Sequence, residues 1–279
     1  MAVRVLSALL LAALSLFATA DAQTATPSSL RADPFSALVG KRKPAAERVA
    51  ADAAVERYVI ATDDRVFLFQ SSGGEGRLKF LCGEGDQRFS CVIDKVNPAE
   101  EIHALTASRV SRGDVVWRNR EGDTIMRIAA YGGVTVFWPG DARGHAASKS
   151  FGEDPPLTLD YATIEVARSR AQTATALISA KVGAPIIFDI GDPGPDGAGG
   201  ATVLADAVVR AADGLARVAE DPTGARVIAA RVRLIRFRPM AEPSLSIKKD
   251  ALTVGYNPAG DIAGRPSSAR MARFLEESL

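Results

Sequence analysis

The fold of this chain is decided by the stretch GDVVWRNREGDTIMRIAAYGGVTVFWP, residues 113–139. In it, short runs of β-branched and aromatic residues alternate with turn residues; the runs are 115–117, 124–129 and 134–137, and the turns are 119–122 and 132–133. A Gly-Gly pair between two such runs is typical of a tight hairpin, because that turn needs a positive φ. The stretch therefore predicts antiparallel strands joined by short turns.

The same alternation continues upstream as far as Tyr58. Further β-branched or aromatic runs occupy residues 58–60, 66–69, 78–82 and 89–93, with turn residues between several of them. Short strands at close spacing, separated by turn signals, are typical of β-sandwiches and barrels. We therefore expect an antiparallel β meander that forms either a small sandwich or a barrel.

Downstream, the pattern changes to alternating helix and strand. A helix is expected over residues 160–182, with Asp160 as its N-cap and with an inward stripe formed by Ile164, Ala167, Ala171, Ala174, Ile178 and Val182. The remaining pattern predicts helices at 201–219, from 223 onward and at 266–279, and strands at 186–190, 231–238, 244–247 and 252–256.

The predicted fold class is therefore α+β, with an N-terminal antiparallel β meander followed by a helix–strand C-terminal unit. Glycine, serine and proline cluster in residues 140–156, which places the boundary between the two units there. The expected organisation is a signal peptide at 1–22, a flexible lead-in at 23–43, a β-rich unit at 44–150 and an α+β unit at 151–279.

The N-terminus predicts export. Arg4 precedes an apolar run over residues 5–18, and Ala18-Thr19-Ala20 and Ala20-Asp21-Ala22 both offer the small-x-small pattern of a cleavage site. The run is shorter than the roughly 20 residues that a membrane-spanning helix needs. We expect cleavage after Ala22, a periplasmic or secreted location, and no transmembrane segment in the mature chain.

Export changes the interpretation of the two cysteines, Cys82 and Cys91. An oxidising compartment favours a disulfide between them, and residues 83–90 resemble the turn of a β-hairpin. Closing a ring of about ten residues would contribute roughly 2–3 kcal/mol in the chain-entropy model. The spacing is not C-x-x-C, so a structural role is favoured over a redox-active one.

Composition excludes several classes of protein. The chain has 279 residues, 47% hydrophobic and 24% charged, which is typical of a globular protein and not of a disordered, collagen-like or polytopic membrane chain. Lys and Arg number 34 against 33 Asp and Glu, a net charge of +1. This balance gives no global reason to expect nucleic acid or an anionic membrane as a partner.

One arginine-rich segment is a candidate anion-binding site. The predicted strand at 231–238 carries Arg231, Arg233, Arg236 and Arg238, and strict alternation would divide them between its two faces. A β-bulge at 234–235 would return all four to one face, where they could bind an anionic glycan or lipid headgroup. The alternative is an ordinary solvated sheet face.

The remaining motifs predict no catalytic residue, metal or cofactor. The loop DIGDPGPDGAGG at 189–200 matches no phosphate-binding pattern, and Asp189, Asp192 and Asp196 lack the spacing of a calcium loop. His103 and His145 belong to no catalytic motif, and Ser246-Ile247-Lys248-Lys249 lacks the partner motifs of S-x-x-K enzymes. The adjacent acids Glu100 and Glu101 are expected to be solvated.

Two stretches resemble a known family. Residues 113–139, and AGRPSSAR at 263–270, resemble a family of uncharacterised secreted alphaproteobacterial proteins known only as a domain of unknown function. The resemblance extends to the helix at 160–182 and the strand after Asp221. It implies an envelope or extracellular setting in a Gram-negative cell, and it carries no activity or site residue.

The sequence favours a non-enzymatic periplasmic protein that binds an envelope component or another protein. The absence of a nucleophile, metal or cofactor motif carries this interpretation. The first alternative is a hydrolase of cell-wall or ester substrates, with acids and serines brought together only by the fold. The second is an inhibitor of a wall-degrading enzyme, acting through a rigid, disulfide-pinned loop.

Overall fold

The computed structural model describes residues 53–191 and 200–279. The predicted signal peptide at 1–22 and the lead-in at 23–43 lie outside these residues, as do Asp192 and Asp196. Within the described ranges, no helix is long and apolar enough to cross a membrane.

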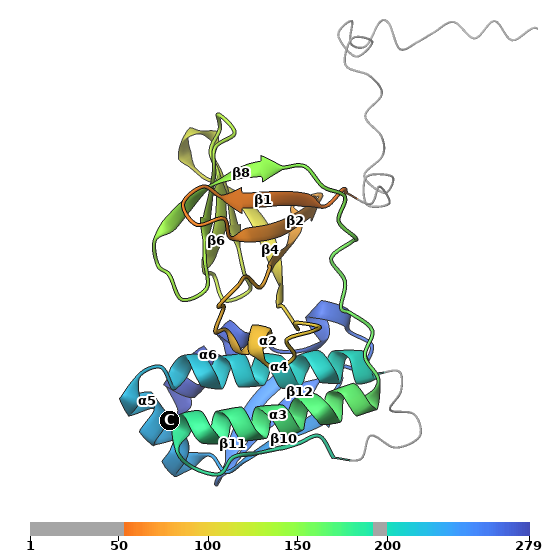
Figure 1. The fold of residues 1–279 in the computed structure, drawn as a ribbon, viewed down its shortest axis with the longest axis vertical. Coiled ribbons are helices and arrows are strands. Elements are labelled where there is room, and N and C mark those ends of the chain that lie inside the picture. Colours follow the sequence, from red (N-terminus) through yellow and green to blue (C-terminus); the bar gives the residue numbers. More distant parts are fainter. Residues whose placement is uncertain (1–52, 192–199) are drawn as a thin grey trace, which may run out of the picture. The chain divides into compact units, whose positions relative to one another are not determined.

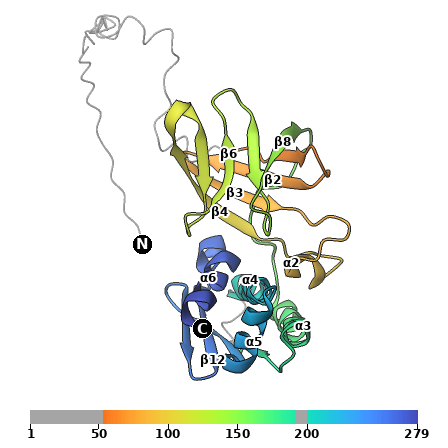
Figure 2. The same cartoon turned by 90° about the vertical axis from the view of Figure 1, so that its left-hand side faces the viewer.

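The first half of the described chain is a closed barrel (Figures 1 and 2), which confirms the predicted antiparallel meander. Each strand pairs antiparallel with the next, and the first pairs with the last, Arg57 lying opposite Ser150. The strands are β1 (Glu56–Ile60), β2 (Val66–Ser72), β3 (Glu75–Phe80), β4 (Ile102–Arg109), β5 (Val115–Arg118), β6 (Thr124–Ile128), β7 (Val134–Phe137) and β8 (Gly144–Ser150).

Large side chains fill the interior of the barrel, as is usual for a barrel of about eight strands. Tyr58 stacks on Phe67 with ring centroids 5.0 Å apart, and Phe69 meets Trp117 edge to face at 5.0 Å. Gly76 is required here, because a Cβ at that position would lie 2.8 Å from the Trp117 ring. The interior is therefore a packed core.

The predictions for the β half were wrong in one segment and incomplete in two others. Residues 89–93 are not a strand: Phe89–Val92 form the short helix α2, so the cysteines do not flank a hairpin turn. The pattern also missed β4 and β8. The sequence of β8, GHAASKS, is polar, and its place in the barrel depends on pairing with β1 and β7.

The second half combines helices with a four-stranded sheet of order β11-β12-β10-β9. Strand β10 runs parallel to both β9 and β12, whereas β11 is antiparallel to β12. The elements are α3 (Ile164–Val182), β9 (Ile187–Asp189), α4 (Ala201–Val218), α5 (Pro222–Arg231), β10 (Leu234–Pro239), β11 (Ser244–Lys248), β12 (Ala251–Tyr256), the 3₁₀ turn η4 (Asp261–Gly264) and α6 (Ser268–Ser278).

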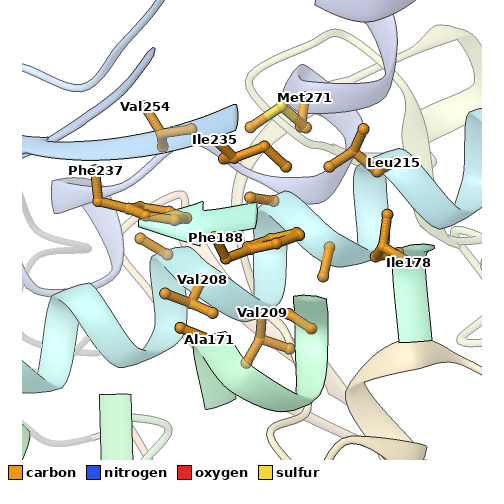
Figure 3. Close-up of a cluster of buried hydrophobic side chains, with 14 of the residues drawn as sticks. Ala171, Ile178, Phe188, Val208, Val209, Leu215, Ile235, Phe237, Val254 and Met271 are labelled. Atoms are coloured by element: carbon orange, nitrogen blue, oxygen red, sulfur yellow. The ribbon is translucent and has the colours of Figure 1, made fainter. Parts of the chain in front are cut away.

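Helices and sheet enclose an apolar core (Figure 3) in which Phe188, Ile235, Phe237 and Val254 of the sheet meet side chains of the helices. The predicted inward stripe of α3 is buried from Ala167 to Val182, and only its first member, Ile164, is partly exposed. The helix begins later than predicted. Its N-cap is Thr163, whose side chain accepts a hydrogen bond from the Val166 amide, and Asp160 lies outside the helix.

Candidate functional site

A buried network of ion pairs links the barrel to the helices, within one compact unit of the chain. Glu101 immediately precedes β4, Arg210 lies on α4, and Arg265 lies between η4 and α6. Their side chains are 7%, 1% and 3% exposed, so each needs a partner to offset the loss of hydration. Glu101 supplies that partner to both arginines, at 3.6 Å in each case.

Helix α4 supplies two further carboxylates to the network. Arg210 lies 3.3 Å from Asp206 and 3.3 Å from Asp213, and Arg265 forms a close ion pair with Asp206. The Nε atom of Arg210 has no partner in hydrogen-bond geometry, so its contact with Asp206 is an ion pair only. Counting Glu101, the cluster has three carboxylates and two guanidinium groups.

Glu101 also caps helix α6. The Ser268 amide donates to Glu101 Oε1 at 3.1 Å, and the Ser268 hydroxyl donates to Oε2. A carboxylate at this position satisfies a free amide and favours the positive end of the helix dipole. One side chain from the edge of the barrel therefore fixes α6 as well as two arginines.

Burial and neighbouring charges shift the pKa values of two carboxyls of the network in opposite directions. Burial by itself would raise the pKa of Glu101, but His103, Arg210, Arg265 and the Ser268 hydroxyl outweigh it and hold that pKa at about 2. Burial raises the pKa of Asp213 to about 6; Glu101 adds to this rise and Arg210 opposes it. Near neutral pH, Asp213 is thus less strongly held in its charged form than Glu101.

A pocket of about 390 Å³ opens beside this network. Its walls come from Glu101–Ala104 at the start of β4, the β5–β6 turn at Asn119–Glu121, the β10–β11 connection, and the segment that leads from η4 into α6. His103 lies in the wall, packed edge-on against Phe80 with ring centroids 5.5 Å apart. Burial lowers the pKa of His103, which favours a neutral imidazole near pH 7.

Charged side chains of both signs line the pocket. Arg120, Arg270 and Glu242 are exposed lining residues, and none of the three has an ion-pair partner among the described residues. Ser267 is already used: its hydroxyl donates to Glu121 at 3.0 Å and accepts from the Arg270 amide at 3.0 Å. The pocket is thus lined by exposed residues whose charges are unpaired and by Ser267, whose hydroxyl already has hydrogen-bond partners.

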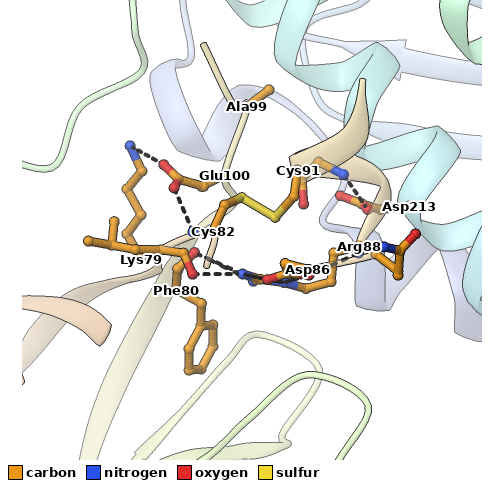
Figure 4. Close-up of a disulfide and its surroundings, with 12 residues drawn as sticks. Lys79, Phe80, Cys82, Asp86, Arg88, Cys91, Ala99, Glu100 and Asp213 are labelled. Atoms are coloured by element: carbon orange, nitrogen blue, oxygen red, sulfur yellow. Dashed lines mark hydrogen bonds and ion pairs between the residues drawn. A yellow bond between two sulfur atoms is a disulfide. The ribbon is translucent and has the colours of Figure 1, made fainter. Parts of the chain in front are cut away.

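The disulfide between Cys82 and Cys91 (Figure 4) confirms the predicted pairing of these two residues. It holds α2 close to the end of β3. The Ser90 amide in α2 donates to Asp213 of α4 at 3.0 Å, so the same carboxylate serves the ion network and anchors the disulfide loop. The disulfide therefore lies beside the packing contact between α2 and α4.

The four arginines of the predicted anion site do not share a strand. Helix α5 continues to Arg231, and Arg233 precedes β10, which begins only at Leu234. Within β10, alternation buries Ile235 and Phe237, so Arg236 and Arg238 face the opposite side without any bulge. The prediction of one strand over 231–238 was wrong, because a helix cap interrupts the basic run.

Two of the other candidate residues from the sequence, His145 and Asp189, also have structural partners. His145 lies on β8, not in a loop, and its Nε2 contacts Asp141 at 2.8 Å and Arg65 at 3.4 Å. Ser246 and Lys249 are both exposed, on β11 and in the turn after it. Asp189 forms an ion pair with Arg236 at 3.4 Å.

The sequence analysis missed the residues that matter most for this site. Glu101 was expected to be solvated with Glu100, yet it is buried in the network, and Glu100 binds Lys79 at 3.0 Å. A signal was present in α4, where Asp206, Arg210 and Asp213 stand at i, i+4 and i+7 spacing within an Ala-, Val- and Leu-rich helix. Charges on an apolar face indicate buried partners elsewhere in the chain.

Fold and site together describe a β-barrel connected to a helix–sheet half by buried ion pairs, with a mixed-charge pocket beside them. The chain belongs to the family described as Domain of unknown function (DUF4908), whose profile matches residues 34–275. No curated protein and no solved structure matches it. The family match confirms the resemblance to a domain of unknown function, whereas secretion and an alphaproteobacterial origin stay predictions.

Proposed function

We propose that this chain is an exported protein of the cell envelope that binds a partner without catalysing a reaction, and that the pocket beside Glu101 holds this partner. One observation carries the proposal. The free charges of Arg120, Arg270 and Glu242 line the pocket, while Glu101 and Ser267, two of the groups with catalytic potential there, are occupied by structural hydrogen bonds.

The charges of the pocket select a class of ligand. Arginine binds carboxylate and phosphate groups through paired N–H donors, and a free glutamate favours an ammonium group. Arg120 and Arg270 could bind an anionic group, with Glu242 supplying the opposite charge. A peptide segment or another small zwitterion fits this arrangement better than a purely anionic ligand, because Glu242 would repel the latter.

A hydrolase is the second candidate, favoured by the hydrogen bond from the Ser267 hydroxyl to Glu121 in the same pocket as His103. A Ser267 nucleophile would have to leave its capping position on α6, since its oxygen accepts the Arg270 amide. The inhibitor hypothesis depended on a protruding hairpin between the cysteines. The segment between the cysteines is not a hairpin, because it ends in α2, which packs on α4.

Site-specific crosslinking in the native envelope tests the proposal. A photoreactive amino acid replaces Pro243 in the wall of the pocket or, as a matched control, the exposed Pro155 between β8 and α3. We expect an adduct at position 243 that R120E/R270E abolishes, in protein recovered from the periplasmic fraction with Gln23 as its first residue. Equal labelling at both positions would refute the pocket as the binding site, and recovery of the protein from the cytoplasm would refute export.

The hydrolase alternative has a separate test. Ser267→Ala removes the hydroxyl, and Ser267→Asn keeps a capping oxygen while removing the nucleophile, without adding a charge beside Glu121. If the chain is a binding protein, S267N leaves the adduct at position 243 unchanged. A hydrolase would instead lose turnover in both variants, so that uncleaved envelope material accumulates and the adduct at position 243 increases.

A further inference from the structure

Two hairpins at one end of the barrel form a rigid, positively charged tip with an exposed aromatic residue. We define the double-hairpin tip as residues 109–114, between β4 and β5, and residues 127–133, which end β6 and lead into β7. Figures 1 and 2 both show these hairpins projecting next to each other. A Cβ placed on Gly113 would lie 3.5 Å from that of Ala130, so the two tips are in close proximity.

Asp114 fixes the two hairpins to each other. Its Oδ1 accepts the Ala130 amide at 2.9 Å, and its Oδ2 accepts Arg127 Nε at 2.9 Å. The Asp114 side chain is only 8% exposed, whereas that of Arg127 is 54% exposed. The carboxylate is thus buried inside the tip, and the arginine that it binds remains available at the surface.

The surface of the tip is basic and carries apolar side chains at its apex. Tyr131 is 90% exposed and Val110 is 38% exposed. Arg109 and Arg112 are exposed, and neither has an ion-pair partner in the part of the chain that the structure describes. Apart from Asp114, which Arg127 binds, the acid closest to Arg109 by strand register is Glu75, which lies opposite Thr106, three residues before Arg109 on β4.

We propose that the double-hairpin tip docks on a membrane surface rich in anionic phospholipid. Tyrosine is favoured at the headgroup level of a bilayer, because its ring is apolar and its hydroxyl is polar. Unpaired arginines beside it are attracted by the negative potential of such a surface. The apex projects from the barrel and has a single large exposed aromatic residue, Tyr131, so it suits a deformable lipid interface better than the fitted surface of an acidic protein.

Co-sedimentation with vesicles tests this proposal on the purified protein. We expect binding to vesicles of phosphatidylcholine mixed with phosphatidylglycerol, weakening as salt is added, and little binding to phosphatidylcholine alone. The double variant R109Q/R112N should lower the partition coefficient by about 25-fold. Asn is used at position 112 because Arg112 has a φ of 71°, a left-handed conformation that Asn tolerates.

Matched variants elsewhere provide the controls. R217Q/R226Q removes the same charge from the exposed surfaces of α4 and α5, and Y161S removes an aromatic side chain that is 85% exposed. Neither should change binding, whereas Y131S should weaken it. Failure of the native protein to bind anionic vesicles, or equal losses in tip and control variants, would overturn the proposal. Salt-sensitive binding to an acidic protein but not to vesicles would instead assign the tip to a protein partner.

Discussion

Replacing Asp213 with asparagine should change how the stability of this protein depends on pH. Burial raises the pKa of Asp213 from 3.8 to about 6, so the folded state binds a proton at this carboxyl more tightly than the unfolded chain does. The contribution of Asp213 to stability is therefore most favourable below pH 3.8 and is lost as the pH rises through about 6. Asparagine has no proton to lose and so gains no charge as the pH rises, and its amide oxygen can still accept a hydrogen bond from the Ser90 amide.

The magnitude follows from the shift in pKa. The rise in the pKa of Asp213 from 3.8 to about 6 corresponds to about 3 kcal/mol between the two protonation states. Relative to the native chain, D213N should therefore become more stable by about 3 kcal/mol as the pH rises across this window. At low pH the Asp213 carboxyl is neutral, so D213N then differs from the native chain only by an amide in place of a neutral carboxyl.

Urea unfolding followed by far-UV circular dichroism at a series of pH values measures this difference. The exposed Asp250 provides a matched control, since D250N makes the same chemical change without burial. Parallel stability curves for D213N and the native chain across the whole window would refute the reasoning. They would mean that Arg210, 3.3 Å away, fully stabilises the charge of Asp213.

Three further predictions concern the network, the disulfide and a helix cap. Glu101 has a pKa of about 2 in the fold against 4.5 for a free side chain, so E101Q should lose about 3 kcal/mol of unfolding free energy near neutral pH. This loss should vanish as acid protonates Glu101 in the native chain, and an unchanged urea midpoint near neutral pH would contradict the prediction. The double variant C82S/C91S should lose about 2–3 kcal/mol of unfolding free energy, and its stability should no longer depend on dithiothreitol. A variant as stable as the oxidised native chain would show that the disulfide adds no stability. T163A should cost about 1 kcal/mol of unfolding free energy and D160A much less, and the reverse order would restore Asp160 as the cap of α3.

Elements defined by local pattern were well predicted from the sequence. The inward stripe of α3, the strand at 252–256 and the hairpin at Gly132-Gly133 each depend on residues close together in the chain. Helical spacing and positive-φ turns are local properties, so one short window contains all the information that is needed. Errors occurred where local signals competed, as at 231–238, where a helix end and a strand start share one basic run.

The candidate site could not be found in this way. Glu101 is one of two adjacent acids, and its partners at 210, 265 and 268 are more than a hundred residues further along the chain. Whether a glutamate is solvated or buried with a cation depends on which segments the fold brings to it. No periodic pattern in the residues near Glu101 indicates partners so far away in the chain.

By itself, the sequence determined the fold class, the disulfide pair and most helices, because hydrophobic spacing and cysteine pairing act along short stretches of chain. Only the tertiary structure decided that the meander closes as a barrel, since closure requires β8, a polar strand, to pair with β1. The tertiary structure also decided the site. Burial gives charges their energetic weight, and the burial of Glu101, Arg210 and Arg265 exists only once the barrel and the helices are in contact.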